Sequence, residues 1–187
     1  MNIANKLTLA RVFMLPLFVL AIEAGVREWF YGFDLQMARY VAVGIFIVAA
    51  ITDFLDGFLA RKLNLITDFG KFMDPLADKI LVGTALIYML VLGDLSAWFV
   101  ALIFAREFII SGLRMLAASK NMVISAGALG KLKTVAQMVM IIVVLPNIGH
   151  DVFSIAGRML IVSSALLTVV SMVDYIWANR QVFLGES

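Results

Sequence analysis

Cysteine is absent from this sequence of 187 residues, and histidine occurs only once, at position 150. Without cysteine the chain has no disulfide framework and no thiolate for catalysis or metal binding. The single histidine falls in an expected loop, where we assign it a structural role. Charged residues make up only 15% of the chain, and the formal net charge of +2 is too small to indicate a nucleic-acid partner. Thiol enzymes and nucleic-acid-binding proteins are therefore disfavoured.

Apolar residues fill the chain instead, since 63% of it is hydrophobic and the mean hydropathy is +1.02. This composition predicts an all-α, polytopic membrane protein, because helices satisfy the backbone groups that lipid cannot. Six segments approach the length of a membrane-spanning helix, roughly 17–25 residues, although the third and fifth are short. They are Thr8–Ala24, Met37–Leu59, Pro75–Leu92, Ala97–Ala118, Leu132–Pro146 and Ser154–Trp177. The first lacks a small-residue cleavage site, so we expect a retained helix.

The basic residues are distributed unevenly between the two sides that these segments define. Of the 15 Lys and Arg residues, all except Arg27, Arg39 and Arg158 fall on the side of the N-terminus. The positive-inside rule therefore predicts that both chain termini lie in the cytoplasm. We find no repeat or linker, so residues 1–187 are expected to form a single membrane-embedded domain. Tyr175 and Trp177, at the end of the sixth segment, are typical of interfacial anchors.

Five aspartates crowd between positions 53 and 78. Asp53 and Asp56 are three residues apart at the end of the second segment, and Asp74 and Asp78 are four apart at the start of the third. Each pair shares a helix face, and a loop of roughly a dozen residues would let the two faces meet. Four converging carboxylates need a counter-charge. Divalent cations with all-oxygen ligation, Mg²⁺ or Mn²⁺, meet that need.

Small and basic residues among the aspartates suit a phosphate-bearing ligand. Gly57, Ala60 and Gly70 would let such a ligand approach the backbone closely, and Arg61 offers a planar cation for phosphate oxygens. The alternative is a solvated interfacial loop in which the acids pair with neighbouring basic residues. The helical phase of both aspartate pairs favours the metal site, and Lys79 then remains a charge at the membrane surface.

Eight of these residues, at fixed spacing, resemble the full signature of the CDP-alcohol phosphatidyltransferase family. The signature here reads Asp53-x2-Asp56-Gly57-x2-Ala60-Arg61-x8-Gly70-x3-Asp74-x3-Asp78. The resemblance implies a CDP-alcohol phosphotransferase-like fold of six transmembrane helices, usually a homodimer, in the cell membrane. It also implies a polar cavity that is open to the cytoplasm.

The same resemblance implies roles for individual residues. The implied metal ligands are Asp53, Asp56, Asp74 and Asp78, which would hold two divalent cations. The implied contacts of the CDP-linked lipid are Gly57, Ala60, Arg61 and Gly70. Asp78 would act as general base while an acceptor hydroxyl attacks the lipid-side phosphorus and CMP leaves. Asp68 lies outside the signature, and we expect it in a loop or helix cap.

The stretch AREFIISGLR offers cations for a second substrate. Arg106 would lie about 18 Å from the end of the fourth helix, at 1.5 Å per residue. A charge at that depth normally faces a polar cavity or an ionic partner such as Glu107, and the residue alone does not decide between them. Arg114 lies nearer the membrane surface, where an arginine can also extend toward water.

The stretch GALGKLKTVAQ adds further polarity at the start of the fifth helix. Lys131 and Lys133 would satisfy a positive flank on the cytoplasmic side. Thr134 and Gln137 carry the polarity further into the helix, which indicates that this face lines a cavity. Together the two stretches offer several cations for one small anionic acceptor.

These stretches, with the start NIANKLTLAR, resemble the phosphatidylglycerophosphate synthases, a subgroup of the same family. That resemblance implies CDP-diacylglycerol as donor, glycerol 3-phosphate as acceptor and phosphatidylglycerol phosphate as product. The candidates for the acceptor phosphate are Arg106, Arg114, Lys131 and Lys133. Asn5 and Thr8, which share a helix face, would border the nucleotide of the lipid.

Other functions remain open at this point. The same chemistry could use another acceptor, such as inositol phosphate, serine or a lipid alcohol. A cation-coupled transporter would need acids near the bilayer midplane and inverted repeats, and the sequence shows neither. A catalytically inactive scaffold is disfavoured by the complete set of aspartates.

Overall fold

The computed structural model describes the backbone of residues 3–63, 68–120, 122, 124 and 127–184, and that part of the chain contains helices and no strand. Side chains are described for residues 10–53, 76, 77, 79–120, 122, 124 and 127–182. The helices are α1 (Ile3–Val26), α2 (Leu35–Leu63), α3 (Asp68–Val91), α4 (Ala97–Ser119), α5 (Ala128–Val144), α6 (Asp151–Ala178) and the short α7 (Gln181–Leu184). The all-α prediction is confirmed.

Each of the six apolar segments coincides with one long helix, but several helices continue past the apolar run. The first helix begins at Ile3 instead of Thr8, and α2 continues to Leu63. The prediction of a loop of roughly a dozen residues after the first aspartate pair is wrong, because α3 already begins at Asp68. Backbone hydrogen bonds within a helix do not require apolar side chains, so polar residues extend the helices.

Two helical stretches in the described chain are long and apolar enough to cross a bilayer by length and composition. They are Leu35–Asp53 in α2 and Asp151–Ala178 in α6, and a shorter apolar stretch covers Lys79–Val91 in α3. Of the other long helices, α4 carries three charged residues and α5 is only 17 residues long. The count of six transmembrane helices therefore stays a prediction.

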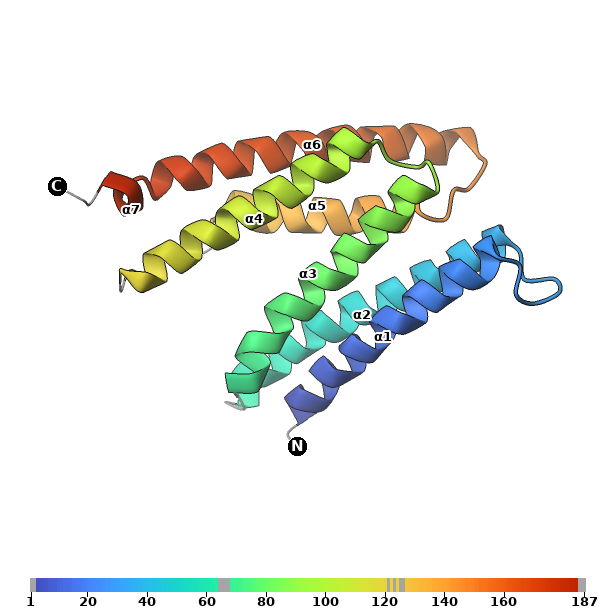
Figure 1. The fold of residues 1–187 in the computed structure, drawn as a ribbon, viewed down its shortest axis with the longest axis horizontal. Coiled ribbons are helices and arrows are strands. Elements are labelled where there is room, and N and C mark those ends of the chain that lie inside the picture. The colour runs from blue at the N-terminus through green and yellow to red at the C-terminus, as the bar shows by residue number, and fades with distance from the viewer. Residues whose placement is uncertain (1–2, 64–67, 121, 123, 125–126, 185–187) are drawn as a thin grey trace.

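Figure 1 shows the helices as long rods that run between two ends of the molecule. The connections α1–α2, α3–α4 and α5–α6 gather at one end, on the right of the view, and the two chain termini lie toward the other. The main hydrophobic core contains buried residues from each of the helices α1, α2, α3, α4 and α5, among them Phe18, Phe46, Leu86, Phe99 and Met140. A smaller core, which we call the α4–α6 cluster, consists of Ile110, Leu113, Ala117, Tyr175 and Val182.

Arg39 of α2 contacts the α3–α4 connection and the residue that follows α5, at the end where the connections gather. Its Nη1 lies 2.7 Å from Oδ2 of Asp94 and donates to the carbonyl oxygen of Leu145 at 2.9 Å. The two charged side chains are only 4% and 9% exposed. His150 lies at the same end, where its Nδ1 accepts a hydrogen bond from the N–H of Val152 at the start of α6. The structural role expected for His150 is confirmed.

Candidate active site

The aspartate signature lies on two helices, α2 and α3. Asp53 is its one acidic member with a described side chain, and its Oδ1 lies 2.7 Å from Nη1 of Arg11 on α1. The Arg11 side chain is 1% exposed and that of Asp53 is 39% exposed. A buried arginine therefore holds the first aspartate of the signature, while part of the carboxylate stays accessible.

The backbone places the remaining members of the predicted donor site on helices. Asp56, Gly57, Ala60 and Arg61 belong to α2, Gly70, Asp74 and Asp78 to α3, and Asn5 and Thr8 to α1. The side chains of these residues lie outside the described ones. Among the side chains that are described, no three His, Asp or Glu residues gather into a metal site. The predicted ligand set and the donor contacts therefore stay predictions.

A cavity of about 630 Å³ opens between α3, α4, α5 and α6. Five basic side chains and one acidic side chain line it, which gives a formal excess of four positive charges. They are Lys79, Arg106, Arg114, Lys131, Lys133 and Glu107. The structure thus brings the four basic residues predicted for the acceptor phosphate into one cavity. Thr134 and Gln137 also line it, which confirms their expected position.

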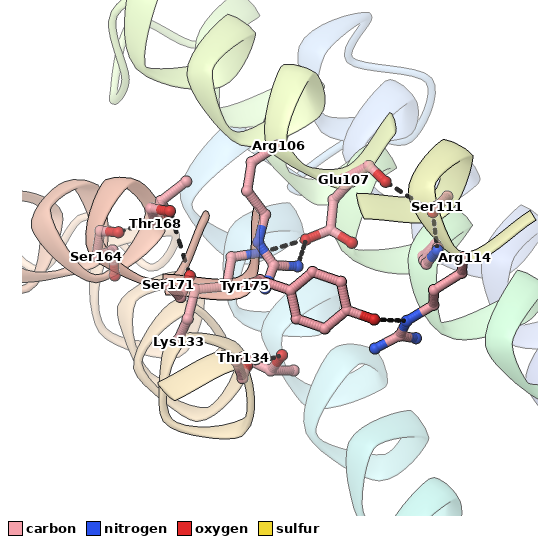
Figure 2. Close-up of polar contacts among 12 residues, drawn as sticks. Arg106, Glu107, Ser111, Arg114, Lys133, Thr134, Ser164, Thr168, Ser171 and Tyr175 are labelled. Carbon is pink, nitrogen blue, oxygen red and sulfur yellow. Dashed lines mark hydrogen bonds and ion pairs between the residues drawn. The ribbon is translucent and has the colours of Figure 1, made fainter. Parts of the chain in front are cut away.

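Glu107 is the centre of the charge network in this cavity (Figure 2). Its Oε1 accepts hydrogen bonds from Nη1 of Arg106 at 3.0 Å and from Nζ of Lys133 at 2.5 Å. Lys133 is 3% exposed and Arg106 is also buried. A Cβ added at Gly130 would lie 3.3 Å from Nη2 of Arg106, so this glycine leaves the room that the guanidinium occupies. Arg106 therefore has both of the environments that its depth suggested, a cavity and an ionic partner.

Two buried donors in this region have no hydrogen-bond partner within the described part of the chain. They are Nε of Arg106 and Nε2 of Gln137. Both residues line the cavity. A buried donor without a partner destabilises the folded protein, unless a ligand or a water molecule accepts its hydrogen bond. The polar wall of the cavity is therefore suited to a ligand with hydrogen-bond acceptors.

Lys79 lies on α3, which carries the second half of the aspartate signature, and its side chain lines the cavity. Its Nζ donates to Oγ of Ser111 at 2.7 Å, and Ser111 donates to the backbone carbonyl of Glu107 at 2.7 Å. We expected Lys79 to be a charge at the membrane surface, but it lines the cavity beside α4. The expectation missed this contact because Ser111 is distant in sequence and its helix approaches α3 only in the tertiary structure.

Tyr175 was assigned to the membrane interface, and that prediction is wrong. Its ring is 5% exposed, lies in the α4–α6 cluster and faces the cavity. Its hydroxyl accepts a hydrogen bond from Nε of Arg114 at 3.0 Å. Trp177 is 70% exposed, as an anchor would be.

A sequence signal for the position of Tyr175 exists in α6. Ser164, Thr168, Ser171 and Tyr175 recur at spacings of four, three and four residues, which places them on one face of the helix. All four are buried. A polar stripe in an otherwise apolar helix indicates the face that packs against other helices, and this stripe predicts that Tyr175 points inward.

Comparison with known proteins identifies the family of this chain. A family model described as CDP-alcohol phosphatidyltransferase matches residues 1–176. The chain belongs to this family. CDP-alcohol phosphatidyltransferases are membrane-associated and generally depend on divalent cations.

Several curated CDP-alcohol phosphatidyltransferases are similar over nearly the whole chain. A Bacillus subtilis protein named CDP-diacylglycerol–glycerol-3-phosphate 3-phosphatidyltransferase is 39% identical over 184 residues, 95% of either chain. An Escherichia coli protein of the same name is 41% identical over 193 residues, 99% of this chain and 98% of the relative. A third, from Rickettsia bellii, is 37% identical over 185 residues, 97% of each.

Proposed function

We propose that this chain transfers the phosphatidyl group of CDP-diacylglycerol to a hydroxyl group of sn-glycerol 3-phosphate. The products are CMP and phosphatidylglycerol phosphate, which makes the protein an enzyme of phospholipid biosynthesis. The cavity with five basic side chains next to the signature helix α3 carries this proposal. The names of its relatives support the same acceptor.

The cavity suits an acceptor that carries a phosphate. Charge-assisted hydrogen bonds from arginine and lysine to phosphate are among the stronger polar contacts in proteins. Arg106, Arg114, Lys131 and Lys133 are the side chains that we assign to the acceptor phosphate. Glu107 holds Arg106 and Lys133 in place, and its single negative charge leaves the cavity with a positive excess.

The reaction joins the acceptor oxygen to the phosphorus that carries diacylglycerol. The bond from that phosphorus to the CMP oxygen breaks, and CMP leaves with the bonding electrons. Asp78, the last aspartate of the signature, takes the proton of the attacking hydroxyl. Because the phosphate of the acceptor is held from α4 and α5, the hydroxyl at its other end can turn toward α3.

The residues that we assign to the metal site are all carboxylates, which are the ligands that Mg²⁺ and Mn²⁺ prefer. Asp53 fits this role, since its carboxylate is partly accessible beside Arg11. Asp53, Asp56, Asp74 and Asp78 would hold two such cations, which supply positive charge to the diphosphate and to the leaving phosphate. We assign the contacts of CDP-diacylglycerol to Asn5, Thr8, Gly57, Ala60, Arg61 and Gly70.

We infer a topology of six transmembrane helices in the cell membrane, with both termini and the active site facing the cytoplasm. The distribution of basic residues supports this orientation. The gathering of three connections at the end opposite the termini supports placing both termini on one side of the membrane (Figure 1). A homodimer is inferred from the resemblance to the family alone.

A panel of acceptors tests the proposed function. Purified protein with CDP-diacylglycerol and a divalent cation is given glycerol 3-phosphate, inositol phosphate, serine or a lipid alcohol, and CMP release is measured. Release only with glycerol 3-phosphate is the expected result. Faster release with any other acceptor would assign the cavity to that molecule instead.

A further inference from the structure

Arg114 enters the cavity near the end of α4, and among the described residues Tyr175 holds it on one edge. Its Nε donates to the hydroxyl of Tyr175 at 3.0 Å, and its Cζ lies 5.5 Å from the centre of the Tyr175 ring. Within the described part of the chain, neither terminal nitrogen of Arg114 forms a hydrogen bond. In Figure 2 the dashed line from the tyrosine hydroxyl reaches Nε of Arg114, and no dashed line reaches the two terminal nitrogens. Among the described residues, none therefore occupies the edge of the guanidinium that can bind a phosphate with two parallel hydrogen bonds.

Tyr175 is a rigid support for this arginine. Its ring is 5% exposed and packs with Ile110 and Leu113 of α4 and with Val182 of α7 in the α4–α6 cluster. A tyrosine has few rotatable bonds, so a packed ring fixes the position of its hydroxyl. Tyr175 is also the one residue of α6, within the described chain, that lines the cavity.

We propose that Tyr175 is a positioning residue for acceptor recognition. It binds Nε of Arg114, and so it turns both terminal nitrogens toward the phosphate of the acceptor. Arginine side chains are flexible, and holding one in its binding geometry before the ligand arrives improves affinity. The inference rests on the proposed function, because the acceptor is taken to be glycerol 3-phosphate. It adds α6 to the helices that determine how well that acceptor binds.

Tyr175→Phe tests the inference with the smallest change. The ring, its packing and its face toward the arginine remain, and only the hydroxyl is lost. Because the hydroxyl supports the arginine and does not itself bind the acceptor, its loss should change affinity only about 2- to 12-fold, the effect of a modest hydrogen bond. We expect the KM for glycerol 3-phosphate to rise within that range, while kcat and the KM for CDP-diacylglycerol stay near the wild-type values. Unchanged KM for glycerol 3-phosphate, or equal increases for both substrates, would overturn the inference.

Tyr88→Phe is the matched control. The Tyr88 hydroxyl donates to Oε1 of Glu23 at 2.9 Å, between α3 and α1 and away from the cavity. This variant also removes one bonded hydroxyl from a partly buried tyrosine. It is expected to leave the KM for glycerol 3-phosphate unchanged. A rise equal to that of Tyr175→Phe would show a general effect of hydroxyl loss and would overturn the inference.

A double-mutant cycle separates positioning from other effects. In an Arg114→Ala background, Tyr175→Phe has no arginine to position, so it should no longer raise the KM for glycerol 3-phosphate. A rise in KM as large as in the wild-type background would show that Tyr175 acts without Arg114.

Arg114→Lys provides a second test that does not depend on the folding of a Tyr175 variant. A lysine keeps the charge but cannot bind the hydroxyl and present two donors to phosphate together. The KM for glycerol 3-phosphate should therefore rise at least about tenfold, by about the loss of one charge-assisted hydrogen bond. A wild-type KM in this variant would refute the geometric role of Tyr175.

The failure of the inference can be told apart from the failure of the proposed function. Wild-type protein that does not use glycerol 3-phosphate would overturn the proposed function, and the inference with it. Wild-type protein that uses this acceptor while Tyr175→Phe and Arg114→Lys keep the same KM would overturn the inference alone.

Discussion

Replacing Lys133 with Met is the substitution that most directly probes the cavity. The Lys133 ammonium is 3% exposed and lies 2.5 Å from Oε1 of Glu107, so it has one fixed place on the cavity wall. Loss of one charge-assisted hydrogen bond to the acceptor phosphate costs about 1.5–3 kcal/mol. At about 1.4 kcal/mol per factor of ten, the KM for glycerol 3-phosphate should rise about 10- to 150-fold.

The same substitution has a smaller effect on folding. Without Lys133, the Glu107 carboxylate still accepts the hydrogen bond from Arg106 at 3.0 Å. The free energy of unfolding should therefore fall by about 1–3 kcal/mol, which is less than the loss when a buried charge has no partner left. Thermal melting in detergent measures this loss separately from turnover.

The assay measures the KM for each substrate while the other substrate is saturating. Lys133→Met should change the KM for glycerol 3-phosphate far more than the KM for CDP-diacylglycerol. Lys120→Met is the control. Lys120 lies at the end of α4, donates to the carbonyl oxygen of Val182 on α7 and does not line the cavity. Equal changes for both substrates in Lys133→Met, or a wild-type KM for glycerol 3-phosphate, would refute the assignment of the acceptor phosphate to this cavity.

Three further predictions concern the donor site and the opposite end of the molecule. Asp78→Asn should leave the protein folded while turnover falls about 10²- to 10⁴-fold, the usual contribution of a general base; wild-type turnover would contradict that role. A chelator should abolish CMP release, and added Mg²⁺ or Mn²⁺ should restore it; release in excess chelator would argue against a metal-dependent reaction. Asp94→Asn should lower the free energy of unfolding by about 3–5 kcal/mol, because Arg39 keeps a buried charge, and Arg39→Met with Asp94→Leu should recover most of that loss in a denaturation assay.

The helices were predictable because their apolar runs are long. The stretch Leu35–Asp53 and the whole of α6 show the signal most clearly, since both are apolar enough to span a membrane. Their ends were less predictable. Hydropathy reports where a helix contacts lipid or core, but the backbone of α2 stays helical through Arg61 to Leu63. The aspartate signature therefore lies largely on helices instead of in a long loop.

The basic residues of the cavity were predictable because charges deep in apolar helices have few alternatives. Arg106 falls under this rule, whereas Lys133 was indicated by the polarity that Thr134 and Gln137 carry further into its helix, and both line the cavity. Of the two contacts that these residues make with Glu107, only one was predictable. Glu107 adjoins Arg106 in sequence, but its contact with Lys133 depends on how α4 and α5 pack.

The role of Tyr175 illustrates the limit of reading a helix by itself. A tyrosine near the end of a membrane helix, beside an exposed tryptophan, has the composition of an interfacial anchor. Its burial depends on α4 and α7, which supply the other members of the α4–α6 cluster. Only the periodic polar stripe along α6 carried information about this packing.

Incorporation of labelled acceptor tests the central claim most directly. Purified protein is mixed with CDP-diacylglycerol, a divalent cation and glycerol 3-phosphate that carries a radioactive phosphorus label, and CMP and labelled lipid are measured together. Our account predicts that one labelled lipid forms for each CMP released and that neither forms without glycerol 3-phosphate. CMP release without labelled lipid would show that the cavity does not hold glycerol 3-phosphate as the acceptor, and would contradict the account.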